Sequence, residues 1–263
     1  MGDRLDAVAR EREVGPLRVR IYRTRGAAGS AAGADVADTI RAAVRDKGSA
    51  RVVFAAAQSQ REMLAALRAA TDLEWGRVTT FQMDEYTAVP PGVASLAEFL
   101  ERALFEAVRP GTVNRIRTGD DPSVECDRYE ELLRAEPLDL VCLGIGESGH
   151  LAYNDPPGAR FADRQFVRLV TIGERSRHQA VNDGHFPSLE SVPNTAYTMT
   201  VPALLSAQKV VGVVPGALRH EALTRALEGS IDEACPASAL RTHPDCTLYV
   251  DEAAYEGRTE EAV

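Results

Sequence analysis

Short apolar runs alternate with amphipathic segments along most of the chain. Between the apolar runs, hydrophobic side chains recur at helical spacing, as they do at Val36, Ile40 and Val44. Strands separated by helices of this length pair in parallel, because each helix carries the chain back across the sheet. The pattern therefore predicts an α/β fold with an open, mostly parallel sheet and helices on both faces. The predicted strands are Leu17–Tyr22, Arg51–Ala56, Arg77–Gln82, Leu138–Leu143, Phe166–Thr171, Val210–Val214 and Thr247–Val250; the predicted helices begin at Ala34 and then span Arg61–Ala70, Ala94–Val108 and Ser123–Ala135.

The two ends of the chain differ from this alternation. Residues 1–33 are interpreted as an N-terminal arm, because an Arg-rich start with one short strand leads into Gly26–Gly33, whose Ala/Gly composition favours flexibility. The polar residues 256–263 predict a frayed tail. No repeat or interdomain linker interrupts the remainder, so the 263 residues are expected to form one domain.

Composition excludes several kinds of partner. The formal net charge of -9 argues against binding to nucleic acid or to an anionic membrane surface, since both need clustered positive charge. No apolar run approaches the roughly 18 residues of a membrane span, and no signal peptide is recognisable, which predicts a cytoplasmic protein. A pocket of Arg and backbone N–H groups can still hold a small anion on an acidic protein.

The cysteines and histidines form no metal or redox motif in the sequence. Cys126, Cys142, Cys235 and Cys246 lack C-x-x-C spacing, which predicts buried free thiols. The five histidines are scattered, without a ligand partner at helix or hairpin spacing, so no metal is expected.

Two adjacent carboxylates follow one of the predicted strands. Ligands of open parallel sheets gather at the carboxyl ends of the strands, and Asp84 and Glu85 come directly after Arg77–Gln82. Both are therefore candidates for acid–base chemistry. The alternative is that Asp84 only caps a turn or helix.

A glycine-rich loop with a histidine follows the strand Leu138–Leu143. Gly146 and Gly149 allow a substrate to approach the main chain closely, and with Ser148 they are candidate substrate contacts. His150 is followed five residues later by Asp155, a carboxylate that can orient the imidazole and stabilise its protonated form. The loop is not a dinucleotide fingerprint, because its third glycine comes too early.

Taken together, these motifs resemble the glucosamine-6-phosphate deaminases and the related 6-phosphogluconolactonases. The family's order is kept from Met83-Asp84-Glu85-Tyr86 with Pro90, through the Gly-x-Gly-x-x-Gly-His loop ending at Asn154-Asp155-Pro156, to His243-Pro244-Asp245 and Val250-Asp251-Glu252. The resemblance covers residues 34–252 and implies a modified Rossmann-like fold. Tyr86 and the Tyr153-Asn154-Asp155-Pro156 segment favour the deaminase branch, since lactonase-like sequences usually depart there.

The resemblance also implies roles for two residues. In the deaminases, the residue matching Asp84 is the base that moves a proton between C2 and C1 of the open-chain sugar. The residue matching His150 helps to open the sugar ring. The implied reaction needs no organic cofactor.

The chain departs from the family at the predicted phosphate site. Where the family has a Gly-Ser/Thr-rich cradle, this chain has Ala55–Gln60, in which Gln58 and Ser59 can still donate hydrogen bonds. Arg219 takes the place of a phosphate-contacting Lys and adds bidentate reach; its alternative is a solvated helix face. A second phosphate-binding Arg has no clean match, and Arg177 and His185 are the candidates.

A further departure bears on the reaction. Deaminases have an aspartate at the position of Ser148 and a glutamate at the position of Asp155. Losing a negative charge beside His150 weakens the support for its protonated form. The sequence therefore favours the hypothesis of a hexosamine 6-phosphate enzyme. This enzyme would abstract the C2 proton of glucosamine 6-phosphate or its N-acetylated form, and the reaction could end in dehydration, by loss of the 3-hydroxyl.

Other functions stay open from the sequence. They are an ordinary deaminase/isomerase, a 6-phosphogluconolactonase, and a non-catalytic sugar-phosphate sensor, which the altered phosphate loop suggests. The expected partner is a small sugar phosphate. Related deaminases are often oligomers, so a homo-oligomer is one expectation, but the family's basic, aromatic C-terminal extension is missing here after Glu252.

Overall fold

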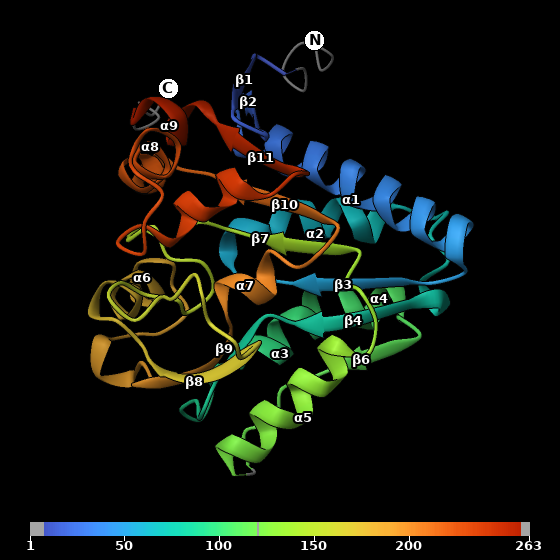
Figure 1. Cartoon of the computed structure of the whole chain (residues 1–263), viewed down its shortest axis with the longest axis vertical. Helices are drawn as coiled ribbons and strands as arrows, with labels where there is room; N and C mark the ends of the chain where they lie inside the picture. Colours follow the sequence, from blue (N-terminus) through green and yellow to red (C-terminus); the bar gives the residue numbers. More distant parts are fainter. Residues whose placement is uncertain (1–7, 120, 259–263) are drawn as a thin grey trace.

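An eight-stranded sheet is the centre of the molecule. The computed structural model describes residues 8–119 and 121–258, and the strand order is β1-β2-β11-β10-β7-β3-β4-β6 (Figure 1). The pair β1/β2 is antiparallel, and every other neighbouring pair in this sheet is parallel. The predicted open, mostly parallel sheet is confirmed. Its strands are β1 Arg10–Val14, β2 Leu17–Tyr22, β3 Ala50–Phe54, β4 Val78–Gln82, β6 Thr112–Asn114, β7 Leu140–Leu143, β10 Lys209–Val214 and β11 Cys246–Asp251.

A second, three-stranded antiparallel sheet has the order β5-β9-β8. It consists of β5 (Asp84–Tyr86), β8 (Val167–Thr171) and β9 (Thr195–Met199), of which only β8 was predicted. The chain passes from the large sheet to the small one at Met83, between β4 and β5. Asp84 and Glu85 therefore come just after the carboxyl end of β4.

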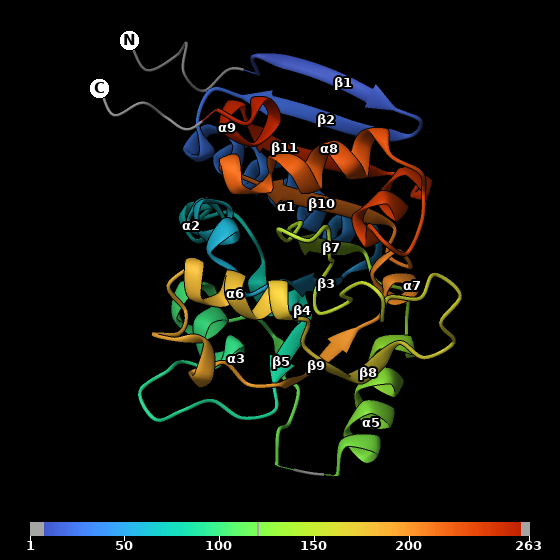
Figure 2. The ribbon, with the colours of Figure 1, turned by 90° about the vertical axis from the view of Figure 1, so that its left-hand side faces the viewer.

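Helices cover both faces of the large sheet, as the sequence predicts. Helices α1, α2 and the α3–α4 segment share one apolar cluster with alternate side chains of β3, β7 and β10. Helices α5, α7 and α8 share a second cluster with the opposite face. The hairpin β1–β2 lies at one end of the molecule and α5 at the other (Figure 2). The helices are α1 Arg25–Lys47, α2 Arg61–Ala69, α3 Leu96–Leu100, α4 Glu106–Val108, α5 Pro122–Arg134, α6 Glu174–Asn182, α7 Val201–Leu204, α8 His220–Glu228 and α9 Glu252–Glu256, with a π-helical turn at Glu101–Phe105 between α3 and α4.

The prediction of a flexible N-terminal arm is wrong for the residues that the structure describes. Strand β2 pairs in parallel with β11, and Gly26–Gly33 lies inside α1. A Cβ atom on Gly33 would lie 2.6 Å from the Cβ of Ala66 in α2. The glycines therefore allow close packing of the two helices, which outweighs the low intrinsic helix propensity of glycine. Residues 1–7 of the predicted arm lie outside the described residues.

Two further predictions concern the tail and the cysteines. Helix α9 ends at Glu256, and residues 259–263 of the predicted frayed tail lie outside the described part of the chain. All four cysteines are buried and free, as predicted. Among the described residues, no helix has the length and apolar character needed to cross a membrane.

Candidate active site

A pocket lies at the carboxyl ends of the parallel strands, where open α/β sheets bind ligands. The segments that follow β3, β4, β7 and β10 form its walls, and α6 closes one side. Its empty volume is about 830 Å³ including space open to solvent. Seven of the predicted site residues line it: Gln58, Ser59, Asp84, Gly146, His150, His185 and Arg219.

Asp84 lines the pocket without a hydrogen-bond partner. The residue is 8% exposed, and no group among the described residues donates to its carboxylate. Burial, and after it the negative charge of Glu85, raises the pKa of Asp84 from 3.8 to about 8. A carboxyl group with such a pKa exchanges protons readily near neutral pH, as a general base or acid must.

Glu85 has a different role from its neighbour. Its carboxylate accepts hydrogen bonds from the backbone N–H groups of Leu96 (3.0 Å) and Ala97 (2.8 Å), at the start of α3, and from the side chain of Gln82 (2.6 Å). Burial raises the pKa of Glu85, although these donors oppose the shift. Glu85 is not among the pocket-lining residues, so its predicted catalytic role gains no support from its position; it holds α3 in place.

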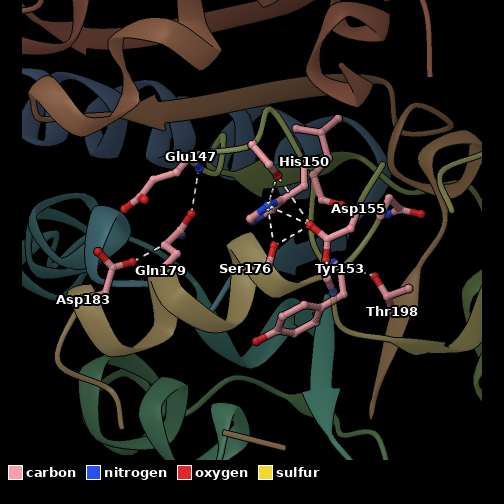
Figure 3. Close-up of polar contacts among 12 residues, drawn as sticks. Glu147, His150, Tyr153, Asp155, Ser176, Gln179, Asp183 and Thr198 are labelled. Atoms are coloured by element: carbon pink, nitrogen blue, oxygen red, sulfur yellow. Dashed lines mark hydrogen bonds and ion pairs between the residues drawn. The ribbon is translucent and has the colours of Figure 1, made fainter. Parts of the chain in front are cut away.

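His150 is held from one side by a polar cluster (Figure 3). Its Nδ1 lies 2.8 Å from the Ser148 hydroxyl and 2.7 Å from the Ser176 hydroxyl, and 3.2 Å from Oδ1 of Asp155. The Ser176 hydroxyl also donates to Asp155. These contacts occupy Nδ1 and fix the ring, which leaves Nε2 as the ring nitrogen for proton exchange with a ligand.

The loop glycines are required by this arrangement. A Cβ atom on Gly146 would lie 2.0 Å from Nε2 of His150, so only glycine lets the main chain pass beside the imidazole. Gly149 has a φ of +84°, in the left-handed region that favours glycine. Both glycines thus allow the backbone conformation of the loop around His150. Gly146 lines the pocket, and Gly149 does not.

Asp155 keeps its negative charge despite being buried. Burial alone would raise its pKa, but His150, the Ser176 hydroxyl and the Gly173 N–H outweigh burial and lower it. The Gly173 N–H donates to Oδ2 of Asp155 at 2.9 Å, at the N-terminus of α6, where the helix dipole favours an anion. Asp155 is therefore a fixed negative charge behind the histidine, and it does not line the pocket itself.

Helix α6 supplies pocket residues that the sequence analysis missed. Ser176, Gln179, Ala180 and Asp183 line the pocket at positions i, i+3, i+4 and i+7, which is one face of a helix. The segment has few apolar residues and therefore no hydrophobic periodicity that predicts a helix. Small and polar residues at this spacing were the signal that could have indicated a ligand-facing helix.

Three of the candidate phosphate residues, Gln58, Ser59 and Arg219, line the pocket, but Arg219 is already paired. Its guanidinium donates to Glu147 at 2.8 Å and to both oxygens of Asp183 at 2.9 Å. Gln179 joins these two acids, accepting from the Glu147 N–H and donating to Asp183 (Figure 3). The alternative of a solvated helix face is wrong, because Arg219 is 7% exposed. The Ser59 hydroxyl accepts a bond from Gln60, so its own hydrogen is left to donate.

Of the two candidates for a second phosphate-binding residue, one lines the pocket and the other does not. Arg177 donates to the backbone oxygens of Leu189 and Val192 and is not among the pocket-lining residues, which contradicts a direct role in binding. His185 does line the pocket, beside the Tyr86 ring at 5.7 Å between centroids, and burial lowers its pKa. Tyr86 and Tyr153, the two tyrosines of the recognised motifs, pack at 5.5 Å in the same wall.

The fold and the pocket together define a proton-transfer site on an open parallel sheet. Within the described residues, no group of three or more His, Cys, Asp or Glu side chains is arranged to hold a metal ion. The pocket instead places an unpaired carboxyl group and a carboxylate-supported imidazole around one space. The class of the protein is thus an α/β enzyme of acid–base chemistry.

Comparison with known proteins identifies the family. The sequence profile of the glucosamine-6-phosphate isomerases/6-phosphogluconolactonase matches residues 23–249. A glucosamine-6-phosphate deaminase of Bacillus cytotoxicus is 34% identical over 214 residues, covering 80% of this chain and 79% of the relative. One of Bacillus thuringiensis is 36% identical over 185 residues, covering 69% and 68%. The chain therefore belongs to the glucosamine-6-phosphate isomerase/6-phosphogluconolactonase family, as its motifs predict.

Solved structures agree with this assignment. A monomeric glucosamine-6-phosphate deaminase superposes with a TM-score of 0.80 at 30% identity, over 91% of this chain and 99% of that one. A 6-phosphogluconolactonase of Thermotoga maritima has a TM-score of 0.73 at 18% identity, over 89% and 99%, and shares the fold.

Proposed function

We propose that this chain is a glucosamine-6-phosphate deaminase, which opens the sugar ring, moves the C2 proton to C1 and releases the amino group as ammonia. One observation carries the proposal: the unpartnered carboxyl group of Asp84 and the carboxylate-supported imidazole of His150 line the same pocket. A protein that only bound a sugar phosphate would need neither a base nor a ring-opening group.

Ring opening is the task assigned to His150. A proton must leave the C1 hydroxyl while another reaches the ring oxygen, and an imidazole can do both in turn. During the transfer His150 becomes positively charged. Asp155, at 3.2 Å from Nδ1, stabilises that charge on the side away from the sugar.

Proton transfer between C2 and C1 is assigned to Asp84. In the open-chain sugar, the C2–H bond is acidified by the adjacent aldehyde, and ionised Asp84 takes this proton and returns it to C1. Removal of the C2 proton leaves an enolamine, and the return of the proton to C1 converts this enolamine to the imine of the ketose. Water adds to the imine carbon and ammonia leaves, so glucosamine 6-phosphate and water yield fructose 6-phosphate and ammonia.

Phosphate binding is assigned to Ser59, Gln58 and Arg219. A phosphate would compete with Glu147 and Asp183 for the guanidinium of Arg219, because both carboxylates already accept from it. The guanidinium has five N–H donors in total, so it can add bonds to phosphate while part of the pairing persists.

Loss of the 3-hydroxyl from the same C2 carbanion is the second candidate. Ser148 favours it, since a neutral hydroxyl stands at Nδ1 of His150 where the deaminases have a carboxylate. Asp155 opposes it, because one carboxylate still supports the imidazolium. Deamination is therefore preferred, and dehydration stays a prediction.

Product identification separates these outcomes. The purified protein is incubated with glucosamine 6-phosphate and, in parallel, with N-acetylglucosamine 6-phosphate; ammonia, fructose 6-phosphate and the substrate mass are followed. Deamination predicts equal amounts of ammonia and fructose 6-phosphate. Dehydration predicts a product lighter by one water, without ammonia.

Two further arms test the remaining alternatives. Hydrolysis of 6-phosphogluconolactone, without turnover of either amino sugar, would replace the proposal by a lactonase. Binding of glucosamine 6-phosphate without turnover, and without exchange of the C2 hydrogen in deuterated water, would identify a sensor.

A further inference from the structure

A second pocket opens beside the first one and is lined by three arginines. We call it the arginine groove and define it by Arg61, Arg68, Arg102, Phe99, His185 and Pro187. Its empty volume is about 1850 Å³ including open solvent. This is larger than the empty volume of the pocket that contains Asp84 and His150, which we call the sugar pocket. Arg61 and Arg68 come from α2, and Arg102 comes from the π-helical turn after α3. Helices α2, α3 and α6 lie on the same side of the molecule (Figure 2).

The groove arginines have no carboxylate partner among the described residues, although acidic residues stand next to them in the sequence. Glu62, beside Arg61, pairs with Arg25 at 2.9 Å. Glu101, beside Arg102, pairs with Arg115. The neighbouring acids are thus directed to cations outside the groove. In a protein with a formal net charge of -9, this leaves a local concentration of unneutralised positive charge.

The geometry of the groove fits an anion with more than one charged group. Arg61 and Arg68 are seven residues apart on one helix, which places their Cα atoms about 10 Å apart along its axis. Ala65 lies between them in the lining and leaves room over the helix surface. The π-helical turn changes the direction of Arg102 relative to a regular helix, and such turns are frequent at functional sites.

The groove lining also contains apolar and aromatic residues. They include Phe99 and Pro187, and His185 adds a second ring. A ligand that filled the groove would therefore place phosphate groups on the arginines and a planar group against these rings. Inorganic phosphate alone would use only part of this surface.

We propose that the arginine groove binds a nucleoside phosphate, at a site separate from the sugar pocket. The proposal goes beyond the proposed function and does not depend on it. Gln58, Phe99 and His185 line both pockets, so an occupant of the groove touches walls of the sugar pocket. Binding in the groove should therefore change the affinity for the sugar phosphate, in a reciprocal way.

Calorimetric titration of the intact protein with ADP tests the site directly. We expect saturable binding of one ADP per chain, weaker binding of pyrophosphate and of ribose 5-phosphate, and a marked loss of affinity between about 0.05 M and about 0.5 M salt. Arg61→Gln, Arg68→Gln and Arg102→Gln should each weaken ADP binding about tenfold, since each removes a charge-assisted contact. Arg61, Arg68 and Arg102 are all exposed, so the three variants are expected to fold.

A matched control and a competition experiment decide the outcome. Arg160→Gln, at an exposed arginine outside the groove, should leave ADP affinity unchanged. Asp84→Asn should bind ADP as the unmodified chain does, whether or not the chain proves to be a deaminase. The proposal is overturned if ADP does not bind saturably, or if Arg160→Gln weakens ADP binding as much as the groove variants do. It is also overturned if glucosamine 6-phosphate displaces ADP fully and the three groove variants do not change ADP affinity.

Discussion

Two aspartates serve the same pocket from opposite environments. Asp84 is buried without a hydrogen-bond donor, and its pKa is raised to about 8. Asp155 is buried too, but His150, Ser176 and the N-terminus of α6 surround it, and its pKa is lowered. The residue type and the degree of burial are similar, so the difference comes from the partners. Burial without partners makes a carboxyl group that exchanges its proton, and burial with partners makes a permanent charge.

This difference indicates a separate chemical role for each aspartate. Asp84 is suited to accept and return a proton, whereas Asp155 stabilises positive charge on the imidazole of His150 from behind the pocket. The neighbouring Glu85 shows how local the effect is. It adjoins Asp84 in sequence, yet its carboxylate accepts four hydrogen bonds and caps α3.

The largest effect is expected from Asp84→Asn. The amide has a similar shape but cannot accept the C2 proton, so kcat for glucosamine 6-phosphate should fall roughly 10³-fold with little change in phosphate binding. Exchange of the C2 hydrogen in deuterated water, followed by NMR, measures the step itself. Glu85→Gln is the matched control: it should reduce thermal stability and leave much more of the exchange rate. Equal losses of exchange in both variants would remove the distinction between the two carboxylates.

The same variant should change stability in a pH-dependent way. Because the folded state holds the Asp84 proton up to about pH 8 while the unfolded state releases it near 3.8, the native chain loses stability as pH rises between these values. The loss is on the order of 5 kcal/mol, at about 1.4 kcal/mol for each pH unit. Asp84→Asn should abolish this part of the slope and unfold at higher denaturant concentration at pH 8. Parallel stability curves for the two proteins would argue against a raised pKa.

Asp155→Asn should have the next largest effect. The substitution removes the negative charge beside Nδ1 of His150 but preserves the volume, so the imidazolium formed in ring opening loses its counter-charge. We expect kcat to fall about 10²-fold. An open-chain substrate analogue bypasses ring opening and should restore much of the C2 exchange. A loss that persists with the analogue would mean that Asp155 acts on proton transfer as well.

The sequence was a good guide to the sheet and a weaker one to its surroundings. Buried parallel strands are continuous apolar runs, so β3, β7, β10 and β11 were predicted within a residue or two of their bounds. The short strand β9 and the helix α6 carry no such signal, since polar residues make up much of both. The Gly26–Gly33 stretch was assigned to a flexible arm because composition does not reveal that α1 packs closely on α2.

For the site, motif resemblance identified Asp84 and His150 but not their partners. Ser176 and Gly173 lie more than fifteen residues beyond the histidine loop, and only the folded chain brings them to Asp155. The pairing of Arg219 with Asp183 depends on the register of α6 against the loop after β10. Charge pairs of this kind are tertiary contacts, and spacing along the sequence does not predict them.

A smaller effect is expected when the rate of C2 hydrogen exchange is measured at different pH values. The base must be ionised, so C2 exchange should increase with pH through the pKa of Asp84, which is about 8 in the free protein. One unit below this value about a tenth of the molecules carry the carboxylate, and one unit above it about nine tenths do. The rate of exchange at low substrate concentration should thus rise about tenfold between pH 7 and pH 9. A rate that is flat in this range, with stability unchanged, would mean that Asp84 is already ionised at pH 7.

The smallest expected effect on kcat distinguishes the two serine hydroxyls beside His150, those of Ser148 and Ser176. Ser176 contacts Nδ1 of His150 and also donates to Asp155, whereas Ser148 contacts Nδ1 at 2.8 Å and reaches Asp155 only at 3.5 Å. Ser176→Ala should therefore lower kcat about tenfold, and Ser148→Ala only about two- to threefold, because the latter leaves the carboxylate's own donor in place. Steady-state kinetics with glucosamine 6-phosphate measures both variants. If Ser148→Ala lowers kcat more than Ser176→Ala does, the Ser148 hydroxyl acts directly on the proton of His150. Ser148 then shares with Asp155 the role of supporting the imidazolium.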